Sequence, residues 1–287
     1  MEKISVVVTV KNDDEGVQVL KKDLARQTRK PHEVIIIRAE DYDDCTRAEG
    51  RNIGIKKARC NIIAVTDAGC RPHKDWLEQI TNPFTSKGPS FQKQIVVAGY
   101  YTVLVKTPFQ RAITPYLAVP WSQNYLPASR SIAFSKRAWK LVGGYPEEAT
   151  SAGEDLAFAR LLSKHPDITM IQAPDALVDW EPPKTTSEYF RNIRDHTRSN
   201  FEARIWPHIF HNLTVLVRWV IFLFIPVLIP FYILWPIFKH AHLASKGPSY
   251  IGRSFIGFIG WLPIVQLMTD AAILAGIMSL WDTGEKQ

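Results

Sequence analysis

Acidic residues occur at two boundaries between predicted secondary-structure elements. The first of them is Asp67. It follows an apolar, β-branched run, Ile62 to Val65, that has the length of a buried strand. Open α/β sheets bind ligands at the carboxyl ends of such strands. A carboxylate there can bind a divalent cation, which in turn can bind a diphosphate. The alternative is a strand followed by an ordinary turn, in which Gly69 lets the backbone reverse.

The second acidic point is the pair Glu154 and Asp155, which comes just before an apolar pattern of helical period. As a plain helix start, acids in the first turn favour the helix dipole by about 0.5 kcal/mol each. As a catalytic pair, one carboxylate could take the proton of a hydroxyl group whose oxygen attacks a carbon centre. The pattern alone is compatible with both interpretations.

Strand and helix patterns alternate along the first part of the chain, and this order must position the first acid. Residues 4–10, 33–37 and 62–67 predict buried strands, while residues 17–28 and 51–59 have helical periodicity. Strand, helix, strand, helix, strand at this spacing is typical of a parallel, doubly wound sheet. We therefore expect an α/β fold with a mostly parallel sheet flanked by helices.

The composition allows one large α/β core plus an appendage, because the chain has 287 residues. Its net charge of +7 fits attraction to phosphorylated donors or to anionic lipid headgroups, as well as an ordinary solvated surface. Nucleic acid is not an expected partner, because the aromatic residues are not interleaved with the basic ones in any recognised module.

The cysteines and the N-terminus bear on the compartment. Cys45, Cys60 and Cys70 have neither metal-ligand spacing nor a disulfide pattern, so we expect reduced thiols in the cytosol. The first residues, Met1 to Lys3, lead directly into a predicted core strand, and we therefore expect no signal peptide.

Two apolar stretches follow residue 204 and predict a membrane-associated region. The uncharged run from Trp219 to Phe238 is close to the roughly 20 residues that a helix needs to cross a bilayer, although its prolines would kink the helix. The stretch 255–281 contains Asp270, and a charge at the bilayer centre costs about 3 kcal/mol. We expect Asp270 to be protonated, to face a partner helix or to lie at a shallow depth. The alternative is a buried helical hairpin in a soluble protein.

The predicted organisation is a catalytic domain at 1–204 and a membrane-associated region at 205–287, with apolar helical segments at about 213–238 and 255–281. Five arginines precede the first apolar segment, which places the catalytic domain on the cytoplasmic face by the positive-inside rule. The loop between the segments is also basic, so two full crossings and a re-entrant hairpin both remain open.

A set of short motifs occurs in a consistent order over about residues 4–200, and in that order the chain resembles the inverting family-2 glycosyltransferases with the GT-A fold. The resemblance implies a Rossmann-like GT-A domain that transfers a sugar from a nucleotide-diphosphate sugar to an acceptor. The motifs are the opening strand, Arg51 to Ile55, Thr66 to Cys70, Ser129 to Phe134, Val142 to Pro146 and Gly153 to Leu156.

The resemblance also implies roles for single residues. Asp155 would be the general base, with Glu154 orienting the acceptor or a water molecule. Trp180 would stack on the acceptor sugar, and Asp67 would bind Mg²⁺ or Mn²⁺. The donor-binding residues implied are Thr9, Asn12, Glu40, Arg51, Asn52, Asp67, Gly69 and Arg130.

Two positions depart from the family pattern. Gly69 stands where a second acid is common, so a metal would be bound by Asp67 with phosphate oxygens and water, or the enzyme needs no metal. Arg38 stands where an acid often reads the nucleotide base, and Glu40 or Asp41 would take that role. The Gln-X-X-Arg-Trp motif of the processive synthases is absent at residues 191–195, which favours a single-addition transferase.

The expected acceptor is a lipid-linked sugar or another membrane glycoconjugate, and membrane lipids are expected partners. One rival interpretation is a membrane scaffold or binding protein with a degenerate transferase domain, which the missing second acid makes conceivable. Another is a sugar-phosphate nucleotidyltransferase, but the loop at residues 11–15 is acidic where that class has a glycine-rich, basic loop.

Overall fold

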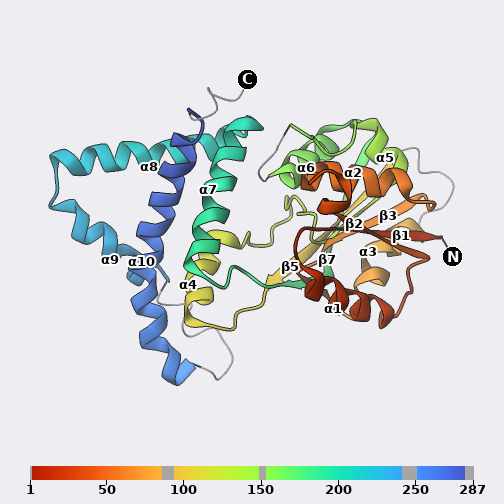
Figure 1. Ribbon diagram of the computed structural model, residues 1–287, viewed down its shortest axis with the longest axis horizontal. Helices are drawn as coiled ribbons and strands as arrows, with labels where there is room; N and C mark the ends of the chain where they lie inside the picture. The colour runs from red at the N-terminus through yellow and green to blue at the C-terminus, as the bar shows by residue number, and fades with distance from the viewer. Residues whose placement is uncertain (1, 86–93, 149–152, 241–250, 282–287) are drawn as a thin grey trace. The chain divides into compact units, whose positions relative to one another are not determined.

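The computed structural model describes residues 2–85, 94–148, 153–240 and 251–281, with the backbone alone described for 251–256. The chain forms two compact units. The first comprises Met1–Val103 and Val119–Glu181, and the second comprises Leu104–Ala118 and Pro182–Gln287. The first unit contains the sheet, and the described part of the second is helical (Figure 1).

The first unit is built on a seven-stranded sheet with the order β2-β1-β3-β6-β5-β7-β4. β1 pairs in parallel with β2 and β3, and β5 pairs in parallel with β7, whereas β6 and β4 run against their neighbours. Five strands therefore point the same way, which confirms the predicted α/β class with a mostly parallel sheet. The strands are β1 Ile4–Val10, β2 Glu33–Arg38, β3 Ile62–Asp67, β4 Cys70–Pro72, β5 Gln94–Val103, β6 Ile132–Ser135 and β7 Ile168–Trp180.

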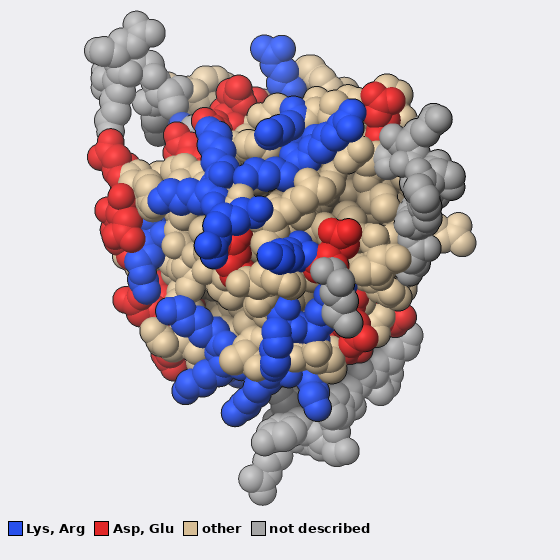
Figure 2. All heavy atoms as spheres, turned by 90° about the vertical axis from the view of Figure 1, so that its right-hand side faces the viewer, with Lys and Arg blue, Asp and Glu red and all other residues tan. Residues whose placement is uncertain are grey.

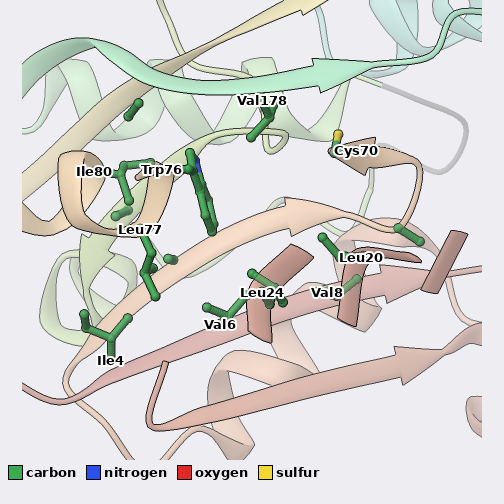
Figure 3. Close-up of a cluster of buried hydrophobic side chains, with 14 of the residues drawn as sticks. Ile4, Val6, Val8, Leu20, Leu24, Cys70, Trp76, Leu77, Ile80 and Val178 are labelled. Atoms are coloured by element: carbon green, nitrogen blue, oxygen red, sulfur yellow. The ribbon is translucent and has the colours of Figure 1, made fainter. Parts of the chain in front are cut away.

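Helices cover both faces of this sheet because successive side chains of each strand point to opposite faces. On one face Val6 and Val8 of β1 pack with Leu24 of α1 and Trp76 of α3 (Figure 3). On the other face Val7 joins a second apolar cluster, which α2, α5 and α6 complete. The helices of this unit are α1 Asp14–Ala25, the 3₁₀ helix η1 Ala39–Tyr42, α2 Arg47–Lys57, α3 Trp76–Thr85, α5 Lys136–Leu141 and α6 Glu154–Lys164.

Capping side chains set the starts of the first two helices, both of which begin earlier than predicted. The Asp13 carboxylate accepts a hydrogen bond of 2.9 Å from Gly16 N, so α1 begins at Asp14 instead of residue 17. Thr46 and Glu49 form a reciprocal capping box, so α2 begins before residue 51. Apolar periodicity marks the buried face of a helix, and it misses a polar first turn.

β5 and β7 pair with one irregularity. Ala98 lies opposite Gln172, but Tyr100 lies opposite Leu177, so β7 advances by five residues (172 to 177) while β5 advances by two (98 to 100). The extra residues of β7 include the exposed Asp175. Such a bulge re-aims the side chains that follow it.

Basic side chains gather on one face of the molecule, toward which the N-terminus of the sheet unit lies (Figure 2). Acidic residues are interspersed among them at fewer places. The net charge of +7 is thus partly concentrated in one region, a distribution that attracts anionic partners.

The described part of the second unit is built of helices that pack in two apolar clusters. Phe109 of α4 and Tyr189 of α7 pack with Phe258 and Leu262 of α10. Because α4 and α7 bury their apolar faces in this way, both belong to the second compact unit, whose longer segment begins at Pro182; the predicted functional domains at 1–204 and 205–287 stay a prediction. The helices described are α4 Pro108–Leu117, α7 Thr186–Glu202, α8 Trp206–Phe224, α9 Leu228–His240 and α10 Ile251–Met278.

Two helices of this unit, Trp206–Phe224 and Gly257–Met278, are long and apolar enough to cross a membrane, by length and composition alone. The second lies within the predicted stretch 255–281. The predicted helical segment at about 213–238 is wrong as a single helix, because the chain leaves helical conformation around Pro226, where a proline removes a backbone donor and clashes with the preceding turn.

Asp270 is buried in the second unit and faces two neighbouring helices, one of the three arrangements expected for it. Its carboxylate accepts hydrogen bonds from Arg218 Nη2 at 2.7 Å, from Trp219 Nε1 at 2.8 Å and from the Tyr232 hydroxyl at 2.7 Å. These bonds tie α10 to α8 and α9, and they offset the cost of burying a charge among apolar helices.

Removing one member of this ion pair should destabilise the helical unit. Asp270→Ala leaves Arg218 without its counter-charge, and because the Arg218 side chain is 28% exposed we expect a loss near the lower end for buried pairs, about 3 kcal/mol. Thermal unfolding of the full chain in detergent measures this loss. The double variant Arg218→Met/Asp270→Leu should recover the part of this loss that comes from the unpaired charge, although Trp219 and Tyr232 still lack their acceptor. A double variant as unstable as the single one would contradict the role of the charge pair.

Candidate active site at the carboxyl end of the sheet

Two predicted site residues are neighbours across the sheet. Thr9 near the end of β1 lies directly opposite Asp67 at the end of β3. Both strands are parallel, so the two side chains lie at the edge where α/β sheets bind ligands. The Asp67 side chain is 32% exposed and therefore reachable from solvent.

Two other predicted residues follow strand ends at the same edge but lie outside this cluster. Asn12 follows β1, is exposed and has a left-handed φ of 53°. Glu40 follows β2 and pairs with Arg38 at 3.5 Å. Arg38 also binds Asp14, so this arginine ties the end of β2 to the start of α1.

Glycines let α2 lie directly against β1. A Cβ atom on Gly54 would stand 2.6 Å from Val7 Cγ1, and one on Gly50 would stand 3.1 Å from Thr9 Cγ2. Only a residue without a side chain allows this approach. As a result Arg51, which follows Gly50 in α2, lies close to the sheet and is only 1% exposed.

Arg51 joins the two acidic points of the sequence. Its Nη2 donates to Asp67 Oδ1 at 2.8 Å, and its Nη1 donates to Glu154 at the start of α6. The guanidinium carbon also lies 5.3 Å from the centre of the Tyr145 ring, an arrangement that favours a cation. One buried cation thus holds together the end of β3, the middle of α2 and the start of α6.

The charges around Asp67 favour its ionised form. Burial by itself raises the pKa of Asp67, but the positive charges of Arg51 and Arg130 and the hydrogen bond from Arg51 outweigh burial and leave that pKa lowered. Burial likewise opposes the charge of Arg51, and the carboxylates of Asp67 and Glu154 keep the pKa of Arg51 well above its usual value.

Asn52 has a structural task. Its Oδ1 accepts hydrogen bonds from Trp139 Nε1 at 3.0 Å and from Tyr145 N at 2.9 Å. Its Nδ2 donates to Tyr145 O at 2.9 Å and to Glu147 at 2.8 Å. These four bonds occupy the hydrogen-bonding capacity of the amide. The predicted donor-binding residue therefore fixes the loop that carries Tyr145.

Arg130 is held between two aromatic rings. Its guanidinium carbon lies 4.0 Å from the centre of the Trp180 ring and 4.7 Å from that of Tyr101. Its buried Nε has no hydrogen-bond partner among the described residues. Trp180, predicted to contact an acceptor, thus supports an arginine. Sequence reasoning missed Tyr101, whose role comes from a strand at 94–103 that it did not identify.

Glu154 and Asp155 open α6 but differ in their surroundings. Gly153, with a left-handed φ of 83°, precedes them. Glu154 is 4% exposed and bonded to Arg51, whereas Asp155 is partly exposed and its Oδ1 accepts from Leu156 N at 2.8 Å. Asp155 is therefore the carboxylate that is open to a reacting group, while Glu154 is committed to the buried cation.

The residues present fit a metal only in part. No three His, Cys, Asp or Glu side chains are placed to bind a metal ion in the part of the chain that the structure describes. Asp67 alone would have to be supplemented by donor phosphates. The turn expected after Asp67 is present at Ala68 and Gly69, but Gly69 has no left-handed φ and a Cβ atom there would meet nothing within 4 Å. A second acid would therefore fit at that position.

No family model and no curated protein matches the chain. Solved structures that resemble it include S. aureus TarS 1-349 in complex with UDP, at a TM-score of 0.47 and 16% identity over 69% of this chain. The same TarS fragment in complex with UDP-GlcNAc has a TM-score of 0.47 and 15% identity over 69% of this chain. Full TarS has a TM-score of 0.44 and 15% identity over 67% of this chain. This chain covers 65%, 66% and 38% of those three chains. The function is therefore argued from the residues themselves.

The lowered pKa of Asp67 predicts a pH dependence of stability. A carboxylate whose pKa is lower in the folded than in the unfolded chain, where it is about 3.9, stabilises the fold fully above the unfolded value. That contribution is lost as the pH falls through the folded pKa. Asp67→Asn should therefore lose less thermal stability than the wild type between about pH 6 and about pH 3.

The matched control is Asp175→Asn, which changes an exposed acid of the same unit. It should follow the wild-type pH dependence, measured as the midpoint of thermal unfolding in detergent. Equal losses for Asp67→Asn and the wild type would contradict the pairing of Asp67 with the buried arginine.

Proposed function

We propose that the chain is a membrane-associated, inverting glycosyltransferase that transfers a sugar from a nucleotide-diphosphate sugar to a glycoconjugate acceptor. The observation that carries the proposal is the meeting of Asp67, Arg51, Arg130 and the Glu154–Asp155 pair at the carboxyl end of the sheet. Carboxylates for proton transfer beside fixed cations for a diphosphate are the two requirements of this reaction.

Arg130 is proposed to bind the diphosphate of the donor. The rings of Tyr101 and Trp180 fix its position, and its guanidinium group has donors to offer to phosphate oxygens. Positive charge at this point stabilises the nucleoside diphosphate as it leaves. A divalent cation, bound by Asp67 and the donor phosphates, would add positive charge to the same leaving group.

Asp155 is proposed as the general base. It would accept the proton of the acceptor hydroxyl while that oxygen forms its bond to the anomeric carbon. In the same step the bond from the anomeric carbon to the diphosphate oxygen breaks, and the electron pair leaves with the diphosphate. One displacement without a covalent sugar–enzyme intermediate inverts the anomeric configuration. Glu154 serves this arrangement by anchoring the first turn of α6 to Arg51.

The helical unit supports the proposed membrane association. Several of its large apolar side chains are more than 70% exposed, namely Leu223, Phe224, Phe231 and Phe238. Exposed apolar surface of this kind suits contact with lipid. The proposed acceptor is accordingly a lipid-linked sugar or another membrane glycoconjugate, and the proposed location of the sheet unit is the cytoplasmic face.

Replacing the proposed base tests catalysis apart from binding. Asp155→Asn keeps the size of the side chain but removes the basic oxygen, so transfer should fall by about 10²-fold or more while donor affinity is retained. The assay offers radiolabelled nucleotide sugars and a membrane lipid extract to the full-length protein, with Asp175→Asn as the control. The wild-type product should have the inverted configuration.

Near-normal transfer by Asp155→Asn would place the base elsewhere. Absence of transfer by the wild-type protein with every donor and extract would favour a membrane scaffold or binding protein instead.

Replacing the proposed diphosphate ligand tests the donor site. Arg130→Met keeps an unbranched apolar side chain against the two rings but removes the charge. Affinity for nucleoside diphosphates, measured by calorimetry with UDP, GDP, ADP and CDP, should fall by about tenfold or more, the loss expected for a charge-assisted hydrogen bond. Arg137→Met, which changes an exposed arginine on α5, is the control. An unchanged affinity would refute the assignment.

A further inference from the structure

Three aromatic side chains form a second cluster in the sheet unit, which the mechanism above does not use. The rings of Tyr100, Trp121 and Tyr125 contact one another pairwise, with centroid distances of 5.5 Å for Tyr100 and Trp121, 5.3 Å for Tyr100 and Tyr125, and 5.4 Å for Trp121 and Tyr125. Tyr125 is 4% exposed and forms the base, whereas Trp121 is partly exposed.

Hydrogen bonds from several segments hold this cluster in place. The Tyr100 hydroxyl donates to Val119 O at 3.0 Å, Gln172 Nε2 donates to Tyr125 O at 3.0 Å, and Tyr125 N donates to Ser122 O at 3.0 Å. The loop that presents Trp121 is thus bonded to both β5 and β7. A ring supported in this way presents a preorganised surface, which lowers the entropic cost of binding.

The cluster is continuous with the candidate active site. The Tyr100 ring lies 5.9 Å from the Tyr101 ring, and Tyr101 is one of the two rings that support Arg130. Burial raises the pKa of the Tyr125 hydroxyl, and the neighbouring Tyr101 adds to that effect. The aromatic cluster is therefore joined through Tyr101 to Arg130, the proposed ligand of the diphosphate.

The chemistry of the cluster suits a sugar ring. A pyranose has an apolar C–H face that packs on an aromatic ring and hydroxyl groups around its rim that need hydrogen-bond partners. The three residues after Trp121 are exposed, polar and able both to donate and to accept hydrogen bonds; they are Ser122, Gln123 and Asn124. A simple apolar lipid chain would leave these groups unused.

We propose that Trp121 is a stacking platform for a sugar ring of the acceptor, so that the acceptor is a saccharide or glycolipid and not a sugar-free lipid phosphate. This inference rests on the proposed glycosyltransferase function, and it adds the residue that holds the sugar part of the acceptor. The sugar that stacks on Trp121 would hold the neighbouring acceptor hydroxyl near Asp155.

Binding of the sugar ring is tested without catalysis. Saturation-transfer NMR of the full-length protein in detergent, with methyl β-D-glucopyranoside and methyl N-acetyl-β-D-glucosaminide as probes, should show signals from the ring protons. Trp121→Ala should abolish them and Trp121→Tyr should retain them in part, since tyrosine keeps an aromatic face. Trp206→Ala, which removes a tryptophan that is 59% exposed in the helical unit, is the matched control and should leave them unchanged. Signals that survive in Trp121→Ala would overturn the proposal.

Transfer kinetics separate this proposal from the function on which it rests. With the same probes as acceptors, Trp121→Ala should lower kcat/KM for the acceptor by about tenfold or more, while hydrolysis of the donor by water is unchanged. Equal kcat/KM in Trp121→Ala and the wild type would refute the platform and leave the transferase standing. A wild-type protein that neither hydrolyses nor transfers from any nucleotide sugar would refute the function, whatever the NMR result.

Discussion

The buried positive charge of Arg51 is the constraint on which the sheet unit depends. An arginine that is 1% exposed is stable only when its charge is matched, and its two counter-charges come from residues 16 and 103 positions further along the chain. The end of β3, the middle of α2 and the start of α6 must therefore be in place together. The pairing also separates the acids. Glu154 is buried in the ion pair with Arg51, whereas the side chains of Asp67 and Asp155 remain partly exposed to solvent.

The first three strands could be predicted from the sequence because each is a short apolar run between turn residues, and the register of parallel pairs brings their ends to one edge. Of the antiparallel strands, β6 contains a short apolar run at Ile132 to Phe134, but that run shows neither its direction nor its neighbours in the sheet. β4 has three residues, and the insertion of β6 between β3 and β5 depends on pairings across long stretches of chain. In the helical unit, hydropathy found the apolar segments but not the break at Pro226, since a proline is compatible with both a kink and an end.

For the candidate site, too, part of the arrangement could be predicted from the sequence and part could not. The positions of Asp67 and of the Glu154–Asp155 pair at element boundaries could be predicted, because acids next to apolar runs are visible in the sequence. Their contacts could not. The Asn52 amide forms hydrogen bonds with Tyr145 and Trp139, and the Trp180 ring packs against the guanidinium of Arg130. These partners are distant in the sequence, so the sequence does not indicate the contacts. Some of the motif residues, such as Asn52, Glu154 and Trp180, thus hold other residues of the candidate site in place.

The bulge in β7 determines which residue of β7 lies opposite the end of β5. Had β7 kept the register in which Ala98 faces Gln172, Leu177 would lie opposite Val103 (five residues beyond each); instead Trp180 lies there. Three additional residues in an exposed stretch thus decide that an indole, and not an aliphatic side chain, reaches this part of the sheet. A change in the length of that stretch would alter which side chain meets the arginine without touching the acids at the sheet edge. The aromatic support of Arg130 can therefore be altered by insertion or deletion alone.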